Sequence, residues 1–63
     1  MKTYIIRDEN SEKFDSISHI QDEKITSLRY AIKLANMAEK EDHKKAYIYR
    51  LKEDGGYQKV IFK

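Results

Sequence analysis

Hydrophobic residues in the middle of the chain recur with the period of an α-helix. Leu28, Ala31, Ile32, Ala35 and Ala38 follow the spacing i, i+3, i+4, i+7 and i+10, which places them on one helical face. This pattern predicts a helix over residues 26–41. The lysines at 40, 44 and 45 favour an end near 41–43, because cations stabilise the negative end of a helix.

The start of this helix has two candidate N-caps. Asp22 is the first, with Glu23 placed in the opening turn where an acid suits the helix dipole. Thr26 is the second, with Ile25 packing on Tyr30 as a hydrophobic staple.

Two β-rich stretches near the C-terminus, residues 46–52 and 57–63, flank Glu53-Asp54-Gly55-Gly56. Asp-Gly and Gly-Gly are strong hairpin signals, because a type I′ turn needs positive φ at both central residues. A two-residue turn at either dipeptide gives the same two faces, since the register shifts by two. We expect the uncharged face to pack on the helix; it comprises Tyr47, Tyr49, Leu51, Val60 and Phe62. The outer face then comprises Ala46, Ile48, Arg50, Tyr57, Lys59, Ile61 and Lys63. A three-residue bulged loop would break this assignment.

The N-terminal third of the chain begins with a β-rich stretch, residues 3–7, followed by turn-favouring residues 8–13. Residues 14–18 form either a second short strand or a loop anchored by Phe14, Ile17 and Ile20. The resulting fold class is α+β, with one helix packed on a small three- or four-stranded, mostly antiparallel sheet in the order β-(β)-α-β-β. Residues 1–63 form a single domain.

Composition limits the class of protein. The 63 residues include no cysteine, so disulfides and thiolate metal sites are excluded. No apolar run approaches the length of a membrane span and the N-terminus lacks the pattern of a signal peptide, so we expect a soluble cytoplasmic protein without a membrane partner. The net charge of +2 is too small to indicate a nucleic-acid or membrane partner by itself. The composition resembles that of small phage and prophage proteins.

Residues that could carry chemistry are few. The two glycines are adjacent, so there is no glycine-rich phosphate loop. His19 and His43 lie far apart in sequence and have no metal-type spacing, and the serines lie in no recognisable nucleophile motif. We therefore expect no enzyme, no cofactor and no metal site.

Three surfaces are candidates for binding. A basic helix stripe is formed by Arg29, Lys33 and Lys40, which would suit phosphates or an acidic protein. A helix edge is formed by Tyr30, Leu34 and Met37, which either the loop of residues 14–20 or a partner covers. The third surface is the outer sheet face, whose candidate binding residues are Ile48, Arg50, Tyr57, Lys59 and Ile61, a composition typical of interface hot spots.

These observations favour a non-enzymatic protein-interaction module. It would bind another protein or form a homodimer, in the manner of a small regulator or inhibitor from a phage or mobile element. Association would also offset the marginal stability of a domain this short. The alternative is a nucleic-acid-binding accessory protein that uses the basic helix stripe or the outer sheet face.

Overall fold

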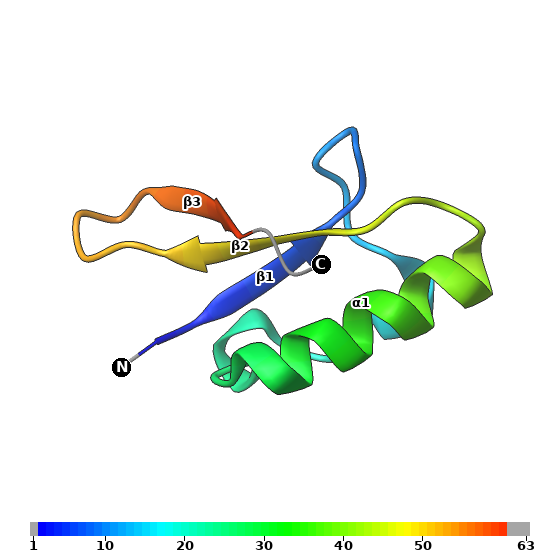
Figure 1. Ribbon diagram of the computed structural model, residues 1–63, viewed down its shortest axis with the longest axis horizontal. Coiled ribbons are helices and arrows are strands. Elements are labelled where there is room, and N and C mark those ends of the chain that lie inside the picture. Colours follow the sequence, from blue (N-terminus) through cyan, green and yellow to red (C-terminus); the bar gives the residue numbers. More distant parts are fainter. Residues whose placement is uncertain (1, 61–63) are drawn as a thin grey trace.

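The computed structural model describes residues 2–60. Three antiparallel strands form one sheet in the order β1-β2-β3, and a single helix lies on one side of it (Figure 1). The elements are β1 (Tyr4–Arg7), α1 (Leu28–Asp42), β2 (Tyr47–Leu51) and β3 (Tyr57–Val60), with short 3-10 turns η1 (Asp15–Ile17) and η2 (Asp22–Lys24). The α+β prediction in the order β-α-β-β is confirmed, with three strands.

The N-cap of helix α1 lies one residue after the second predicted cap, Thr26. The Ser27 hydroxyl accepts a hydrogen bond from the Tyr30 N–H at 3.5 Å, so Ser27 is the N-cap and both predicted caps are wrong. Asp22 instead opens η2, which ends before Ile25, and the Ile25 carbonyl accepts a hydrogen bond from the Tyr4 N–H at 2.8 Å. Because this hydrogen bond holds Ile25 beside β1, the helix begins only after it, at Leu28. The predicted end is confirmed, because the helix stops at Asp42.

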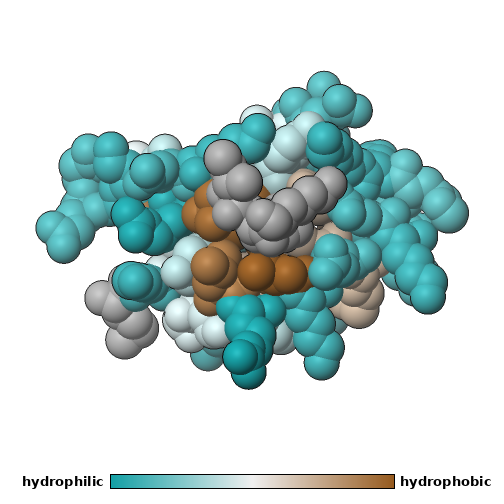
Figure 2. All heavy atoms as spheres, in the orientation of Figure 1, coloured by the Kyte–Doolittle hydropathy of each residue, from teal (hydrophilic) through white to brown (hydrophobic). Residues whose placement is uncertain are grey.

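The core lies between α1 and the sheet. Ala31, Ala35 and Ala38 are fully buried, and such small side chains let the helix backbone approach the strands closely. Their buried neighbours in the core are Tyr4, Ile6, Phe14, Ile17, Ile25, Leu34, Ala46 and Ile48. Figure 2 shows hydrophobic residues gathered at the centre of this view, between the strands and the helix, with hydrophilic residues at both ends.

The segment between β1 and α1 covers part of the helix. Residues 14–18 do not form the optional second strand; Phe14 and Ile17 are buried and Ile20 is partly buried, so the anchored loop is the alternative that the structure shows. The turn η1 packs on α1, and Leu34 of α1 is buried in the same core as Phe14 and Ile17.

The faces predicted for β2 are wrong. Ile48 pairs with Val60 and Tyr49 with Lys59, and residues 52–56 between the strands are odd in number. Compared with a two-residue turn, a loop with an odd number of residues shifts the strand register by one. This shift changes which side chains of β2 lie on the same face as a given side chain of β3. Ile48 is therefore fully buried while Tyr47 and Tyr49 are half-buried on the opposite face.

For the other hairpin residues, some of the predicted faces are correct and some are wrong. Leu51 is exposed and Ala46 is buried, both contrary to prediction. Val60 packs against the core as predicted. The predictions for Ile61, Phe62 and Lys63 lie outside the described residues.

Within residues 2–60, no helix is both long and apolar enough to cross a membrane.

Candidate interaction surface

The outer face of the sheet, opposite α1, is rich in tyrosine. Strand alternation and the observed register place one set of side chains on it. This outer face comprises Ile5, Tyr47, Tyr49, Leu51, Tyr57 and Lys59. No element covers these side chains in the described part of the chain, and Tyr57 is 54% exposed and Leu51 39% exposed. Three tyrosines and Leu51 are therefore available for contact on this sheet face, whereas Ile5 is buried between its neighbours.

Two lysines hold the ring of Tyr47. The Lys59 Nζ lies 4.3 Å from the ring centroid, and the Lys45 Nζ lies 5.6 Å from it. Both are within the range of cation–π attraction, which restrains the tyrosine and concentrates positive charge at this end of the face.

A shallow hollow of about 250 Å³ lies at the centre of the outer face, lined by Ile5, Arg7, Ser11, Tyr49 and Tyr57. Ile5 lies directly opposite Tyr49 and is only 8% exposed, so it forms an apolar floor. The Arg7 guanidinium is bound to the Asp22 carboxylate, with Nη2 and Oδ2 2.7 Å apart. Its charge is satisfied within the chain, which leaves the hollow mainly aromatic and aliphatic.

The rim of this hollow depends on Asp8. One carboxylate oxygen of Asp8 accepts hydrogen bonds from the backbone N–H groups of Asn10 and Glu12, and its other oxygen lies 3.7 Å from the Lys44 Nζ. The Glu12 N–H, followed by the Asn10 N–H and the Lys44 ammonium, lowers the pKa of this buried carboxyl, against the opposing effect of desolvation. The charged form thus stabilises the turn that carries Ser11 in a left-handed conformation, at φ 62°.

The predicted outer-face residues do not stay together. Tyr57 and Lys59 lie on the outer face as expected, but the surface position predicted for Ile48 is wrong because it is in the core. Arg50 lies on the helix side of the sheet, where its guanidinium donates to the Gln58 side-chain oxygen at 3.2 Å. Ile61 lies outside the described residues.

The helix candidates are also divided. Leu34 is buried in the core, while Tyr30 and Met37 remain 40% exposed each. The basic stripe of Arg29, Lys33 and Lys40 is exposed. It belongs to the helical layer, so it cannot act together with the tyrosine-rich face on the other side of the sheet.

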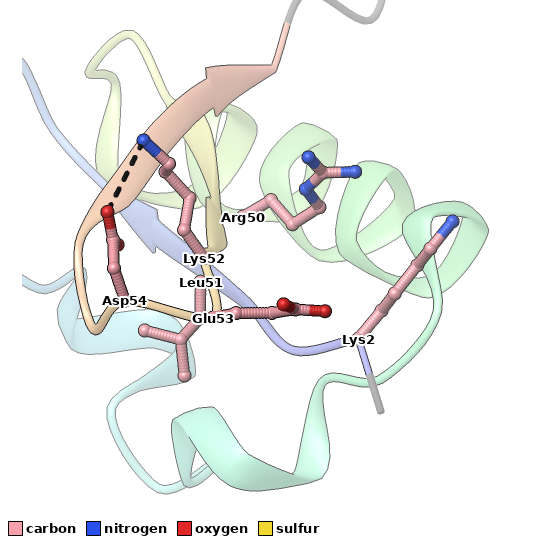
Figure 3. A pocket seen from close by; sticks show the side chains of 6 residues that line it. All are labelled: Lys2, Arg50, Leu51, Lys52, Glu53 and Asp54. Carbon is pink, nitrogen blue, oxygen red and sulfur yellow. Dashed lines mark ion pairs between the residues drawn. The ribbon is translucent and has the colours of Figure 1, made fainter.

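A second hollow, with a volume of about 610 Å³, lies beside the tip half of the hairpin and is lined by Lys2 and residues 50–54. Figure 3 shows Lys2, Arg50 and Glu53 extending to one side of the hairpin, with Leu51 on the other side. Lys52 and Asp54 form an ion pair at 3.8 Å. Apart from Leu51, the side chains that line this hollow are charged, and none of them carries a hydroxyl, thiol or imidazole nucleophile.

The two histidines lie apart from both hollows. His19 is exposed in a turn, and His43 is exposed at the end of α1 in a left-handed conformation, at φ 55°. Among residues 2–60, no three histidine or carboxylate side chains are grouped as metal ligands would be.

Sequence reasoning missed Ile5, Tyr47, Tyr49 and Leu51 as surface residues. A chemical signal was present for Tyr47 and Tyr49, because a buried tyrosine usually needs a partner for its hydroxyl whereas Ile48 has no polar group to satisfy. No such signal existed for Ile5 and Leu51, which carry no hydroxyl.

Comparison of the chain with protein-family models, with curated proteins and with solved structures finds no match.

Proposed function

We propose that the chain is a non-enzymatic protein-interaction module that binds its partner through the outer face of the sheet. The observation that carries this proposal is the uncovered set of Tyr47, Tyr49, Tyr57 and Leu51 around the Ile5 floor. Tyrosine supplies a large contact area with little loss of conformational freedom, and it is enriched at interface hot spots.

The total exposed surface supports the same proposal. The accessible surface of the chain is 4766 Å², whereas a compact monomer of 7.5 kDa exposes about 4,200 Å². The hairpin accounts for part of this difference, because Figure 1 shows its tip reaching beyond the first turn of α1. Covering the outer face by a partner would bring the burial closer to that of a typical domain.

A role as a small cytoplasmic regulator or inhibitor, of the phage or mobile-element type, is the biological setting we propose. The absence of cysteine and the short, lysine-rich chain support it. An inhibitor of this kind needs only one rigid face to occupy a site on its target.

Capture of the partner from a lysate of the source organism tests the proposal. The tagged wild-type chain and the Met37→Asp variant should retain the same bound protein, and Tyr57→Asp and Leu51→Asp should lose it. Met37 is the matched control, because it is as exposed as Leu51 but lies on α1. Loss with Met37→Asp and retention with Tyr57→Asp would place the contact on the helix and contradict the proposal.

Binding of single-stranded nucleic acid is the second candidate. The specific observation in its favour is that three tyrosines and two lysines share the outer face, which is the composition of a base-stacking platform. Against it, two lysine ammonium groups already lie over the Tyr47 ring, where a base would have to compete with them. Anisotropy titration of a fluorescent oligonucleotide separates the two candidates, because phosphate contacts lose affinity steeply as salt rises.

A further inference from the structure

The free edge of the sheet is β3, because β2 is central and the Tyr4 N–H at the far edge donates to the Ile25 carbonyl. The Leu51 N–H donates to the Thr3 carbonyl and the Lys52 N–H to the Gly56 carbonyl, so odd residues of β2 bond toward β1 and even residues toward β3. The alternation of an antiparallel ladder then directs the backbone groups of Gln58 and Val60 at β2. The N–H and C=O groups of Tyr57 and Lys59 point to the open side within the described residues.

A hollow of about 310 Å³ lies beneath this free edge, on the helix side of the sheet. Leu28, Tyr4 and Val60 supply its apolar lining, and Arg50, Gln58, Lys2 and Lys59 complete it. It exists because α1 lies against β1, β2 and η1, whereas β3 lies beyond the helix. A strand added beside β3 would place alternate side chains over this hollow.

We propose that the partner's contact includes an extended acidic segment that pairs with β3 as a fourth strand. This inference rests on the proposed protein-binding function and specifies its chemistry. Side chains on one side of the added strand enter the hollow beside Leu28 and Val60, which favours aliphatic residues. Those on the other side join Tyr57 and Lys59 on the outer face, so the added strand extends that face.

Charge selects an acidic segment over a second copy of the chain. Lys59 and Arg50 have no carboxylate within ion-pair distance among residues 2–60, and Arg50 bonds only to the neutral Gln58 side chain. The acids nearest this edge, Glu53 and Asp54, lie at the hairpin tip, and Asp54 is paired with Lys52. Antiparallel pairing of β3 with β3 of a second copy, centred on Lys59, would bring two Lys59 side chains together, and like charges across strands are destabilising. In any register of that pair, neither strand supplies an acid to Lys59.

The direct test is an NMR titration of the full chain with a synthetic, end-capped peptide of alternating glutamate and valine, about six residues long, the usual strand length. At saturation, the Tyr57 and Lys59 amides should shift, and their hydrogen exchange should slow by about 10-fold or more, as new ladder bonds form. The matched peptide with lysine in place of glutamate should bind at least about 10-fold more weakly.

A variant that alters the backbone separates the contribution of the Lys59 N–H to binding from that of the lysine side chain. Lys59→Pro removes an N–H that does not bond to β2, so the hairpin should fold and peptide binding should be lost. Lys59→Gln, the control, keeps the N–H and should keep binding with reduced affinity. Equal binding of both peptides, unchanged exchange in the wild-type chain, or retained binding by a folded Lys59→Pro variant would overturn the proposal.

Two further outcomes identify a different occupant and also overturn it. The first is a wild-type dimer, in the absence of peptide, that Lys59→Pro converts to a monomer in sedimentation. The second is an oligonucleotide that produces the slowed exchange when the peptide does not. The proposed function is tested separately, because a captured partner lost with Tyr57→Asp but retained by Lys59→Pro would exclude only the added strand.

Discussion

The two faces of the sheet differ in what covers them. On the helix side, Ile6 and Ile48 lie against three alanines of α1 and are 2% exposed or less. On the outer side, Tyr49, Leu51 and Tyr57 have no covering element within residues 2–60. The first face packs closely on these alanines and buries aliphatic side chains together with Tyr4. The second carries three tyrosines, which combine apolar surface with a hydroxyl. We infer that the inner face stabilises the fold while the outer face is free to bind.

This comparison predicts unequal costs for similar truncations in one strand. Ile48→Ala should lower the free energy of unfolding by about 2–5 kcal/mol, because it leaves a cavity against α1. Leu51→Ala, on the outer face, should cost about 1 kcal/mol or less. Urea unfolding followed by circular dichroism measures both values, and an equal cost for the two variants would contradict the division of the faces.

The rim of the outer face should respond to acid. The pKa of Asp8 is lower in the folded chain than its ordinary value of 3.8, so the unfolded chain takes up the proton first. The stability from this carboxylate is therefore fully present above about pH 4 and is lost as the pH falls through the lower folded pKa.

Unfolding midpoints measured between neutral and strongly acidic pH test this effect. The expected loss of stability is smaller than that from truncating a core side chain, because only one group titrates. The Asp8→Asn variant keeps an oxygen acceptor for the Asn10 and Glu12 N–H groups and removes the charge. Its stability should depend less on acid than that of the wild type. An identical acid profile in both proteins would show that Asp8 does not stabilise the turn as a carboxylate.

The smallest expected effect is at the end of the covering helix. His43 has a φ of 55°, a conformation that favours glycine, and its N–H donates to the Glu39 carbonyl at 3.0 Å. His43→Gly should raise the free energy of unfolding by about 0.5–1 kcal/mol. Glu41→Gly, inside the helix two residues earlier, should lower it by about 1 kcal/mol. Thermal melts give both signs, and destabilisation by His43→Gly would show that the imidazole makes a contact that stabilises the fold.

The helix and the hairpin were predictable because local residue patterns indicate each of them. The spacing of the alanines identifies α1, and Gly55, with a φ of 90°, occupies a position where glycine is needed. Whether the hairpin loop contains an even or an odd number of residues was not predictable from the turn residues. The Lys52 N–H donates to the Gly56 carbonyl at 2.7 Å and the Gly55 N–H to the Lys52 carbonyl at 3.0 Å, and this closed loop uses the same glycines that a two-residue turn would.

The residues of the candidate site depend on the length of this loop. Tyr57 and Lys59 were correctly predicted on the outer face of the sheet, whereas Tyr47, Tyr49 and Leu51 were wrongly predicted on the helix side. For Leu34 the sequence predicts two alternatives, cover by the loop of residues 14–20 or by a partner, and the choice between them has a different origin. It depends on a contact between α1 and η1, segments distant in sequence, and periodicity within one helix cannot decide which neighbour covers an edge.

The measurement that tests the central claim most directly is a methyl-resolved nuclear Overhauser spectrum of the full chain. Ile48 shares the core with Ala31, Ala35 and Ala38, so its methyl groups should give cross-peaks to the methyl groups of these alanines, and the ring protons of Tyr49 should give none. Tyr49 should instead contact Ile5 across the strands. Cross-peaks from the Tyr49 ring to the helix alanines, with none from Ile48, would reverse the two faces and remove the tyrosine-rich surface on which the proposed function rests.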